Sequence, residues 1–160
     1  AVFTMGALTG TIKDAVDEMR EAGQKIGVVT LKCFRPFPFA AVREALRHVS
    51  RVLVIERMMS AGGAGAVSLE VMKALKGTAV DQKTVYAGLG GRSVSKASFK
   101  KVFGAALRNE LQEDEFFLDL DRELLSRQLE REKTSRHIGP LPEALNRHVN
   151  ERKLARGEEI

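Results

Sequence analysis

The chain has 160 residues, a formal net charge of +5 at pH 7, 44% hydrophobic residues and 29% charged residues. This length supports one ordinary hydrophobic core with a modest appendage, and the composition excludes an intrinsically disordered chain. No apolar run approaches the roughly 20 residues that span a bilayer, and the first residues lack the order of a signal peptide. We therefore expect a cytoplasmic protein without a membrane partner.

The positive charge does not indicate a nucleic-acid partner. Residues 1–111 contain 17 Lys and Arg against 9 Asp and Glu, but these are not gathered into a basic block interleaved with aromatic side chains. The single cysteine, Cys33, cannot form an internal disulfide, and one thiolate is too few for an iron–sulfur cluster. We expect Cys33 to behave as a small apolar side chain inside a strand.

Strand-like and helix-like segments alternate along the first two thirds of the chain. Apolar, β-branched stretches predict strands at residues 2–5, 26–33, 51–56 and 84–88. Apolar side chains at helical spacing predict helices at residues 11–22, 41–49, 67–75 and, after a cap at Ser93 or Ser95, up to residue 107. This alternation predicts an α/β fold: a three-layer, Rossmann-like open sheet, mostly parallel, with helices on both faces.

Two details of these elements can also be predicted. Thr11 with Asp14 approximates a capping box, and Gly23 lies where a left-handed C-terminal cap is expected. The nearly continuous apolar character of 26–33 and 51–56 predicts strands that are buried on both faces.

Residues 112–160 differ in character from residues 1–111, so we expect an α/β domain over 1–111 and a charged, mainly helical C-terminal extension over 112–160. Within the extension, 116–120 is expected to form a short edge strand and 123–136 a charged helix. The strong apolar anchors of that helix are Leu124, Leu125 and Leu129. Because one narrow stripe buries little surface, we expect the extension to gain order only when it packs on this domain or on a neighbouring subunit.

Glycine-rich turns follow three of the predicted strands. The turn at residues 6–11 can direct backbone N–H groups at an anion, which makes Thr9 and Gly10 candidates for cofactor binding. This turn lacks the Gly-Lys-Ser/Thr end of a Walker loop and the three-glycine spacing of a dinucleotide fingerprint. A tight turn that needs glycine conformations accounts for it as well.

The other two turns allow the same pair of interpretations. Glycines at 62–65 follow the third strand, where open α/β sheets often bind ligands, but close packing against a neighbouring chain also explains them. Glycines at 88–91 precede an arginine and can either cradle a phosphate or let the next helix start sharply. The candidates for cofactor binding in these turns are Gly62, Gly63, Gly65 and Arg92.

Glu56, at the carboxyl end of the third strand, is the best-placed carboxylate for a site, and an ion pair with Arg57 or another arginine is the structural alternative. The histidines, His48, His137 and His148, lie far apart in the sequence and show no metal-ligand spacing. We therefore assign no catalytic residue and no metal site.

Four segments in one order carry a family resemblance. They are residues 5–17 (MGALTGTIKDAVD), 29–38 (VTLKCFRPFP), 52–57 (VLVIER) with the following glycine turn, and 86–95 (YAGLGGRSVS). In combination they resemble the alpha subunit of pyruvate (2-oxoacid):ferredoxin oxidoreductases, over about residues 1–105. The part resembled is the transketolase-C-terminal-like domain.

The resemblance implies a part in converting a 2-oxoacid, CoA and oxidised ferredoxin into acyl-CoA, carbon dioxide and reduced ferredoxin. The family uses thiamine diphosphate, magnesium and [4Fe-4S] clusters, but their binding motifs lie in other domains or subunits, so this chain is expected to bind none of them alone. The implied partners are pyrimidine-binding, diphosphate-binding, gamma-type and ferredoxin-like parts, with ferredoxin reached through the complex.

Within that family, the domain is chiefly architectural, and the chain alone is expected to be inactive. Two alternatives remain open: a stand-alone flavodoxin-like module that binds a nucleotide or anion, and a protein-interaction module.

Overall fold

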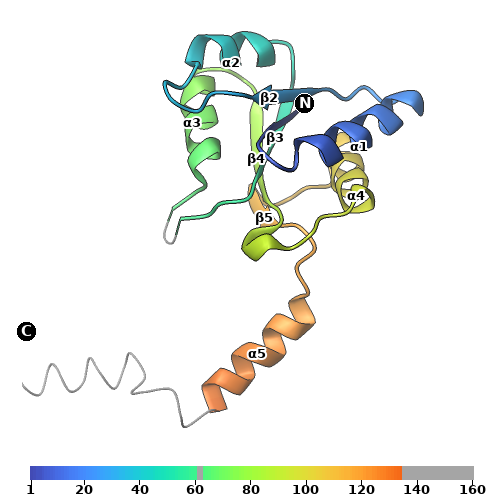
Figure 1. Ribbon diagram of the computed structural model, residues 1–160, viewed down its shortest axis with the longest axis vertical. Coiled ribbons are helices and arrows are strands. Elements are labelled where there is room, and N and C mark those ends of the chain that lie inside the picture. The colour runs from blue at the N-terminus through green and yellow to red at the C-terminus, as the bar shows by residue number, and fades with distance from the viewer. Residues whose placement is uncertain (61–62, 135–160) are drawn as a thin grey trace, which may run out of the picture. The chain divides into compact units, whose positions relative to one another are not determined.

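The structure, a computed structural model, describes residues 1–60 and 63–134 and follows the expected alternation of strands and helices (Figure 1). The elements in chain order are β1 (Val2–Met5), α1 (Thr9–Glu21), β2 (Val28–Leu31), α2 (Phe39–Leu46), β3 (Arg51–Glu56), α3 (Ala66–Leu75), β4 (Asp81–Tyr86), η1 (Leu89–Gly91), α4 (Lys96–Leu107), β5 (Glu115–Phe117) and α5 (Arg122–Thr134).

The strands form one five-stranded sheet in the order β2-β1-β3-β4-β5, and every pairing is parallel. In Figure 1, α1 and α4 cover one face of this sheet and α2 and α3 cover the other. The predicted three-layer α/β fold is therefore confirmed. Because all strands point the same way, every loop that leads from a strand into a helix lies at one edge of the sheet, its carboxyl edge.

Two apolar clusters fill the spaces between the layers. Alternation along β3 sends Leu53 and Ile55 into the cluster under α1 and α4, and Val52 and Val54 into the cluster under α2 and α3. All four side chains are at most 3% exposed. The prediction that 51–56 is buried on both faces is thus confirmed, because β3 lies in the middle of the sheet.

The first helix starts earlier than predicted. Thr9 begins α1, and its N–H donates to the carbonyl of Gly6 at 3.1 Å. The predicted capping box of Thr11 and Asp14 is wrong, because both residues lie inside the helix, and no side chain caps its start. The predicted end is confirmed, since Gly23 has φ 82° and its N–H donates to the carbonyl of Arg20 at 2.9 Å.

The prediction for residues 26–33 is wrong in two respects. The strand β2 ends at Leu31, and it is an edge strand whose first three residues are only half-buried. Cys33 lies beyond the strand and is exposed, and its Sγ donates to the carbonyl of Arg35 at 3.1 Å. An apolar sequence does not distinguish an edge strand from a central one, because the difference depends on which strands pair.

The compact α/β unit extends to Leu120, beyond the expected boundary at residue 111, because β5 pairs with β4. The second unit is Asp121–Ile160, of which α5 is described. Asp121 caps this helix by accepting a hydrogen bond from the N–H of Leu124 at 2.9 Å. The three leucines of the predicted stripe are all exposed.

No helix in the described ranges is both long and apolar enough to cross a membrane. The segment expected beyond 134 lies outside the described residues.

We predict that acid breaks the contact between α1 and α4 only at unusually low pH. Hydrogen bonds from Lys100 and Lys96 of α4 lower the pKa of Glu18 to about 2 from an ordinary 4.5, and Lys100 Nζ lies 2.8 Å from Glu18 Oε2. Since the folded pKa is depressed, the stabilisation is complete above 4.5 and is lost as the pH falls towards 2. An NMR titration of the Glu18 carboxyl group measures this pKa.

The matched control for that titration is a lysine on the same helix. Lys100→Ala should raise the midpoint of Glu18, whereas Lys101→Ala, at an exposed neighbouring position, should leave it unchanged. Equal midpoints in the two variants would contradict the assignment.

Candidate functional site at the carboxyl edge of the sheet

The sequence candidates gather at the carboxyl edge of the sheet. The chain passes from β1 outward to β2 and then returns to β3 on the other side of β1, so the strand order reverses between β1 and β3. Ligands of open α/β sheets commonly bind at such a point. The loops after β1, β3 and β4 bring Thr9, Gly10, Gly63, Gly65 and Arg92 to this edge, while Gly62 lies outside the described residues.

Glu56, the last residue of β3, caps the helix α3. Its Oε1 accepts a hydrogen bond from the N–H of Val67 at 2.7 Å, and its Oε2 accepts one from the N–H of Ser68 at 3.1 Å. The helix itself has Gly65 at its N-cap, which has no side chain to do this. A buried carboxylate from a neighbouring strand therefore satisfies two N–H groups at the positive end of the helix dipole, where an external anion would otherwise bind.

Gly65 is required by the closeness of this contact. A Cβ at residue 65 would lie 1.9 Å from Glu56 Oε2 and 2.7 Å from Oε1. The Ser68 hydroxyl also donates to the carbonyl of Gly65 at 2.9 Å. The glycine thus serves close packing between a strand and a helix of the same chain.

Tyr86, the last residue of β4, links this cap to the edge strand. Its hydroxyl accepts a hydrogen bond from the N–H of Gly65 at 3.2 Å and donates to Glu115 Oε2 at 2.9 Å. Its ring lies against that of Phe117, with centroids 5.3 Å apart. Burial, followed by the hydrogen bond to Glu115, raises the pKa of Tyr86 above its ordinary value of 10.0.

The turn after β4 is held by Arg57, whose Nε and Nη2 both donate to the carbonyl of Gly88 at 3.3 and 3.2 Å. Gly88 has φ 69°, and a Cβ there would lie 2.9 Å from the carbonyl oxygen of Arg92, so glycine is needed for both conformation and space. The turn borders a depression of about 540 Å³ that Arg92, Phe117 and Leu120 also line. Arg57 therefore bonds this turn and does not pair with Glu56.

The turn after β1 is simpler. Thr9 is half-buried, and its Oγ1 is inaccessible and has no hydrogen-bond partner in the described structure. Gly10 is exposed, and a Cβ there would meet no atom within 4 Å. The cation Lys32 follows the neighbouring strand β2.

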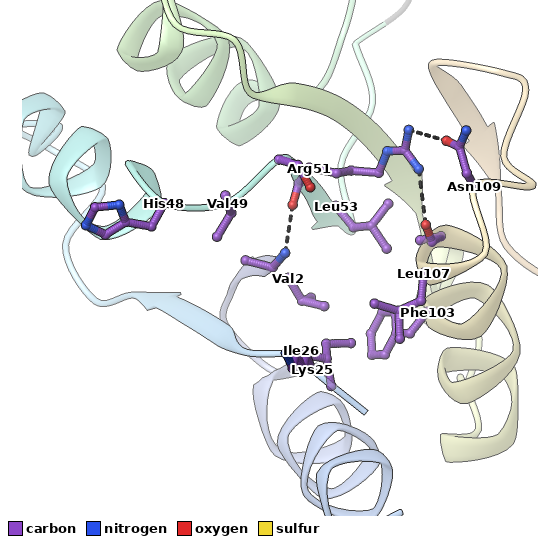
Figure 2. Close-up of a pocket in the computed structure, with 13 residues that line it drawn as sticks. Val2, Lys25, Ile26, His48, Val49, Arg51, Leu53, Phe103, Leu107 and Asn109 are labelled. Carbon is purple, nitrogen blue, oxygen red and sulfur yellow. Dashed lines mark hydrogen bonds between the residues drawn. The ribbon is translucent and has the colours of Figure 1, made fainter. Parts of the chain in front are cut away.

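A second depression, of about 570 Å³, lies at the opposite edge, where the strands begin (Figure 2). Its arginine is already engaged: Arg51 donates to Asp81 Oδ2 at 2.6 Å, to Asn109 Oδ1 at 2.6 Å and to the carbonyl of Ala106 at 3.1 Å. His48, at its rim, accepts a hydrogen bond from Arg47 Nε at 2.7 Å. The two depressions are of similar size, and the hydrogen bonds of Arg51 join β3, β4 and the end of α4 around this one.

Sequence reasoning found Glu56 and Gly65 but missed the residues that connect them to the rest of the edge. Tyr86 and Ser68 lie within elements that were treated as plain core, and Glu115 lies in a segment read only as acidic. One feature of the sequence could have indicated Tyr86: it is the single tyrosine of the chain and it ends the strand β4, which pairs with the strand that ends in Glu56.

Within the described residues, no group of three or more His, Cys, Asp or Glu is placed to hold a metal ion. His137 and His148 lie outside them.

Comparisons with known proteins agree with this picture of one domain. A family model described as pyruvate:ferredoxin oxidoreductase core domain II matches residues 1–99. The pyruvate synthase subunit PorA of Methanosarcina barkeri is 33% identical over 130 residues, which is 78% of this chain and 32% of that protein. The ketoisovalerate oxidoreductase subunit VorA of Pyrococcus horikoshii is 37% identical over 100 residues, 61% of this chain and 25% of that protein.

A third relative is more similar over a shorter stretch. The alpha subunit of the NADH-dependent phenylglyoxylate dehydrogenase of Aromatoleum evansii is 53% identical over 57 residues, 36% of this chain and 14% of that protein. The chain therefore spans at most about a third of the length of these three relatives.

We predict that Gly65→Ala destabilises the fold by about 1–3 kcal/mol, because the added methyl group overlaps the Glu56 carboxylate. Gly63→Ala is the matched control, since among the described residues a Cβ there meets Ser60 Cβ alone, at 3.9 Å, and we expect a change within about 0.5 kcal/mol. Urea unfolding measures both. The penalty at residue 65 should shrink in a Glu56→Ala background, and full additivity of the two substitutions would count against a direct contact.

The chain has a single tyrosine, so an alkaline ultraviolet titration reports on Tyr86 alone. We expect a midpoint above 10.0, and a lower one in Glu115→Gln, which removes the neighbouring charge. Because the folded pKa is raised, stability should be unaffected below pH 10 and should fall as the pH rises beyond it. A midpoint in Glu115→Gln equal to that of the unchanged chain would contradict the hydrogen bond between these residues.

Proposed function

Because the chain belongs to the pyruvate:ferredoxin oxidoreductase core domain II family, we propose that it is an architectural domain of the alpha subunit of a 2-oxoacid:ferredoxin oxidoreductase. The whole enzyme would convert a 2-oxoacid, CoA and oxidised ferredoxin into acyl-CoA, carbon dioxide and reduced ferredoxin. This domain would supply shape and contact surface, and the reacting groups would come from the rest of the enzyme.

The observation that carries the proposal is that Glu56 caps the helix α3. It is the best-placed carboxylate at the edge where ligands of such sheets bind, and both of its oxygens are committed to N–H groups of α3. General acid–base catalysis needs a carboxyl group that can reach a substrate and exchange a proton with it. A buried carboxylate that caps a helix serves the fold instead.

The cofactors of the complex would be thiamine diphosphate, magnesium, [4Fe-4S] clusters and CoA, bound chiefly by other parts. Support for the cluster assignment comes from Cys33, the one cysteine of the chain, which can give a cluster at most one of its usual four thiolates. The partners would be the pyrimidine-binding, diphosphate-binding, gamma-type and ferredoxin-like parts.

Thr9, Gly10, Gly63 and Arg92 remain the candidates for contact with a neighbouring part or its cofactor. Arg92 is the best of them, since its exposed side chain makes no hydrogen bond or ion pair within the described residues.

The substrate would be a 2-oxoacid, and the names of the relatives point to pyruvate, ketoisovalerate or phenylglyoxylate. The match to subunits of larger oxidoreductases favours this proposal over a stand-alone flavodoxin-like module.

We expect the chain alone to be inactive and to be required by the rest of the enzyme. The test is 2-oxoacid- and CoA-dependent reduction of a viologen dye by the chain alone, by the remaining parts alone and by the two combined. Activity should appear only in the combination. Turnover by the chain alone would overturn the architectural role, and full activity without it would show that the domain is dispensable.

A further inference from the structure

Exposed apolar side chains of the α/β unit are concentrated at one edge of the sheet. Those at the carboxyl edge, on strand ends, loops and first helical turns, are Met5, Phe39, Met58, Met59, Leu69, Phe117 and Leu120, each at least 38% exposed. At the amino edge, Leu107 is the one large apolar side chain with comparable exposure among the described residues. Single exposed apolar residues are ordinary, but a concentration on one surface marks a contact site.

The loops of this edge also contain more cations than anions. Within the α/β unit, which ends at Leu120, the charged residues in the loops at the carboxyl edge are Lys32, Arg35, Arg57, Arg92 and Asp119, four cations against one anion. Arg35 pairs with Glu70 and Arg57 bonds the carbonyl of Gly88, whereas the side chains of Lys32 and Arg92 are exposed and have no hydrogen-bond or ion-pair partner among the described residues. Methionine, aromatic residues and arginine are the side chains that protein interfaces favour.

Hydrogen bonds hold several parts of this edge in place. The Glu56 cap holds the start of α3, Arg57 fastens the turn at Gly88, and Tyr86 ties the same region to Glu115. The depression of about 540 Å³ lies between that turn and the segment after β5. A surface that is ordered before binding loses less entropy when a partner docks.

We propose that the carboxyl edge is the docking surface for another part of the oxidoreductase, and that this part presents an apolar centre with acidic side chains opposite Lys32 and Arg92. The inference rests on the proposed function and specifies which surface of this domain contacts the rest of the enzyme. The helix α5 of this chain is a poorer occupant, because residues 122–134 contain four Lys and Arg against three Asp and Glu and would leave both cations without a counter-charge.

The methionines of the chain provide a built-in probe of this surface. Hydrogen peroxide oxidises exposed methionine faster than buried methionine, and peptide mass spectrometry follows each site separately. In the isolated chain, Met58 and Met59 should react about as fast as Met72, which is exposed on α3 away from the edge, while the buried Met19 should react slowly. On assembly with the remaining parts of the enzyme, Met58 and Met59 should slow by roughly tenfold, and Met72 should not change.

A charge reversal gives a second readout. Arg92→Glu should weaken binding of the chain to the remaining parts by roughly tenfold or more, whereas Lys76→Glu, at the opposite edge, should have little effect. Calorimetry or sedimentation measures the binding, and Arg92→Gln separates loss of the cation from repulsion. Thermal unfolding of both variants checks that each remains folded.

The outcomes separate this inference from the proposed function. If the chain binds the remaining parts but Met58 and Met59 keep their reactivity, the docking surface is wrong and the proposed function stands. If the chain does not bind them, both fail. If Leu125→Ser and Leu129→Ser in α5 speed the oxidation of Met58 and Met59 in the isolated chain, the helix covers the edge and the inference is overturned.

Discussion

The carboxylate of Glu56 at the start of α3 is the contact on which the rest of the carboxyl edge depends. Burying a charged carboxylate costs several kcal/mol unless hydrogen bonds and nearby positive charge compensate. For Glu56, two backbone N–H groups and the positive end of the helix dipole provide this compensation. The same two hydrogen bonds fix the start of α3 next to the last residue of β3. The same contact requires glycine at residue 65, whose N–H is then directed at the Tyr86 hydroxyl.

This arrangement explains how residues that resemble a ligand site can serve the fold instead. A carboxylate, glycine-rich turns and arginines at the carboxyl edge are the ingredients of many ligand sites in open α/β sheets. In this domain the carboxylate neutralises the helix start from within, and Arg57 binds a backbone carbonyl of the neighbouring turn. The polar groups therefore brace the loops, and the surface left for contact is apolar with exposed cations.

The two edges of the sheet differ because their polar groups are satisfied in different ways. At the amino edge, Arg51 bonds three acceptors from β4 and from the end of α4, which links β3 to those elements. At the carboxyl edge, the hydrogen bonds connect neighbouring strand ends and loops, and methionine and aromatic side chains stay exposed to solvent. The hydrogen-bonding groups of Arg51 are thus used within the first edge, whereas the second edge leaves apolar and cationic side chains for contact with a partner. A partner fits a chain that covers at most about a third of the length of the three relatives described.

The sequence by itself determined the alternation of elements, the mostly parallel sheet and the burial of 51–56 on both faces, since periodicity and β-branched runs depend only on local spacing. It also singled out Glu56 and the glycine turns, because their positions after strands are visible along the chain. The tertiary structure decided what those residues do. Strand order made β2 an edge strand and exposed Cys33, and the return of the chain to β3 placed Glu56 under α3. The pairing of β5 with β4 brought Glu115 to Tyr86, a contact between residues 29 positions apart that no local pattern encodes.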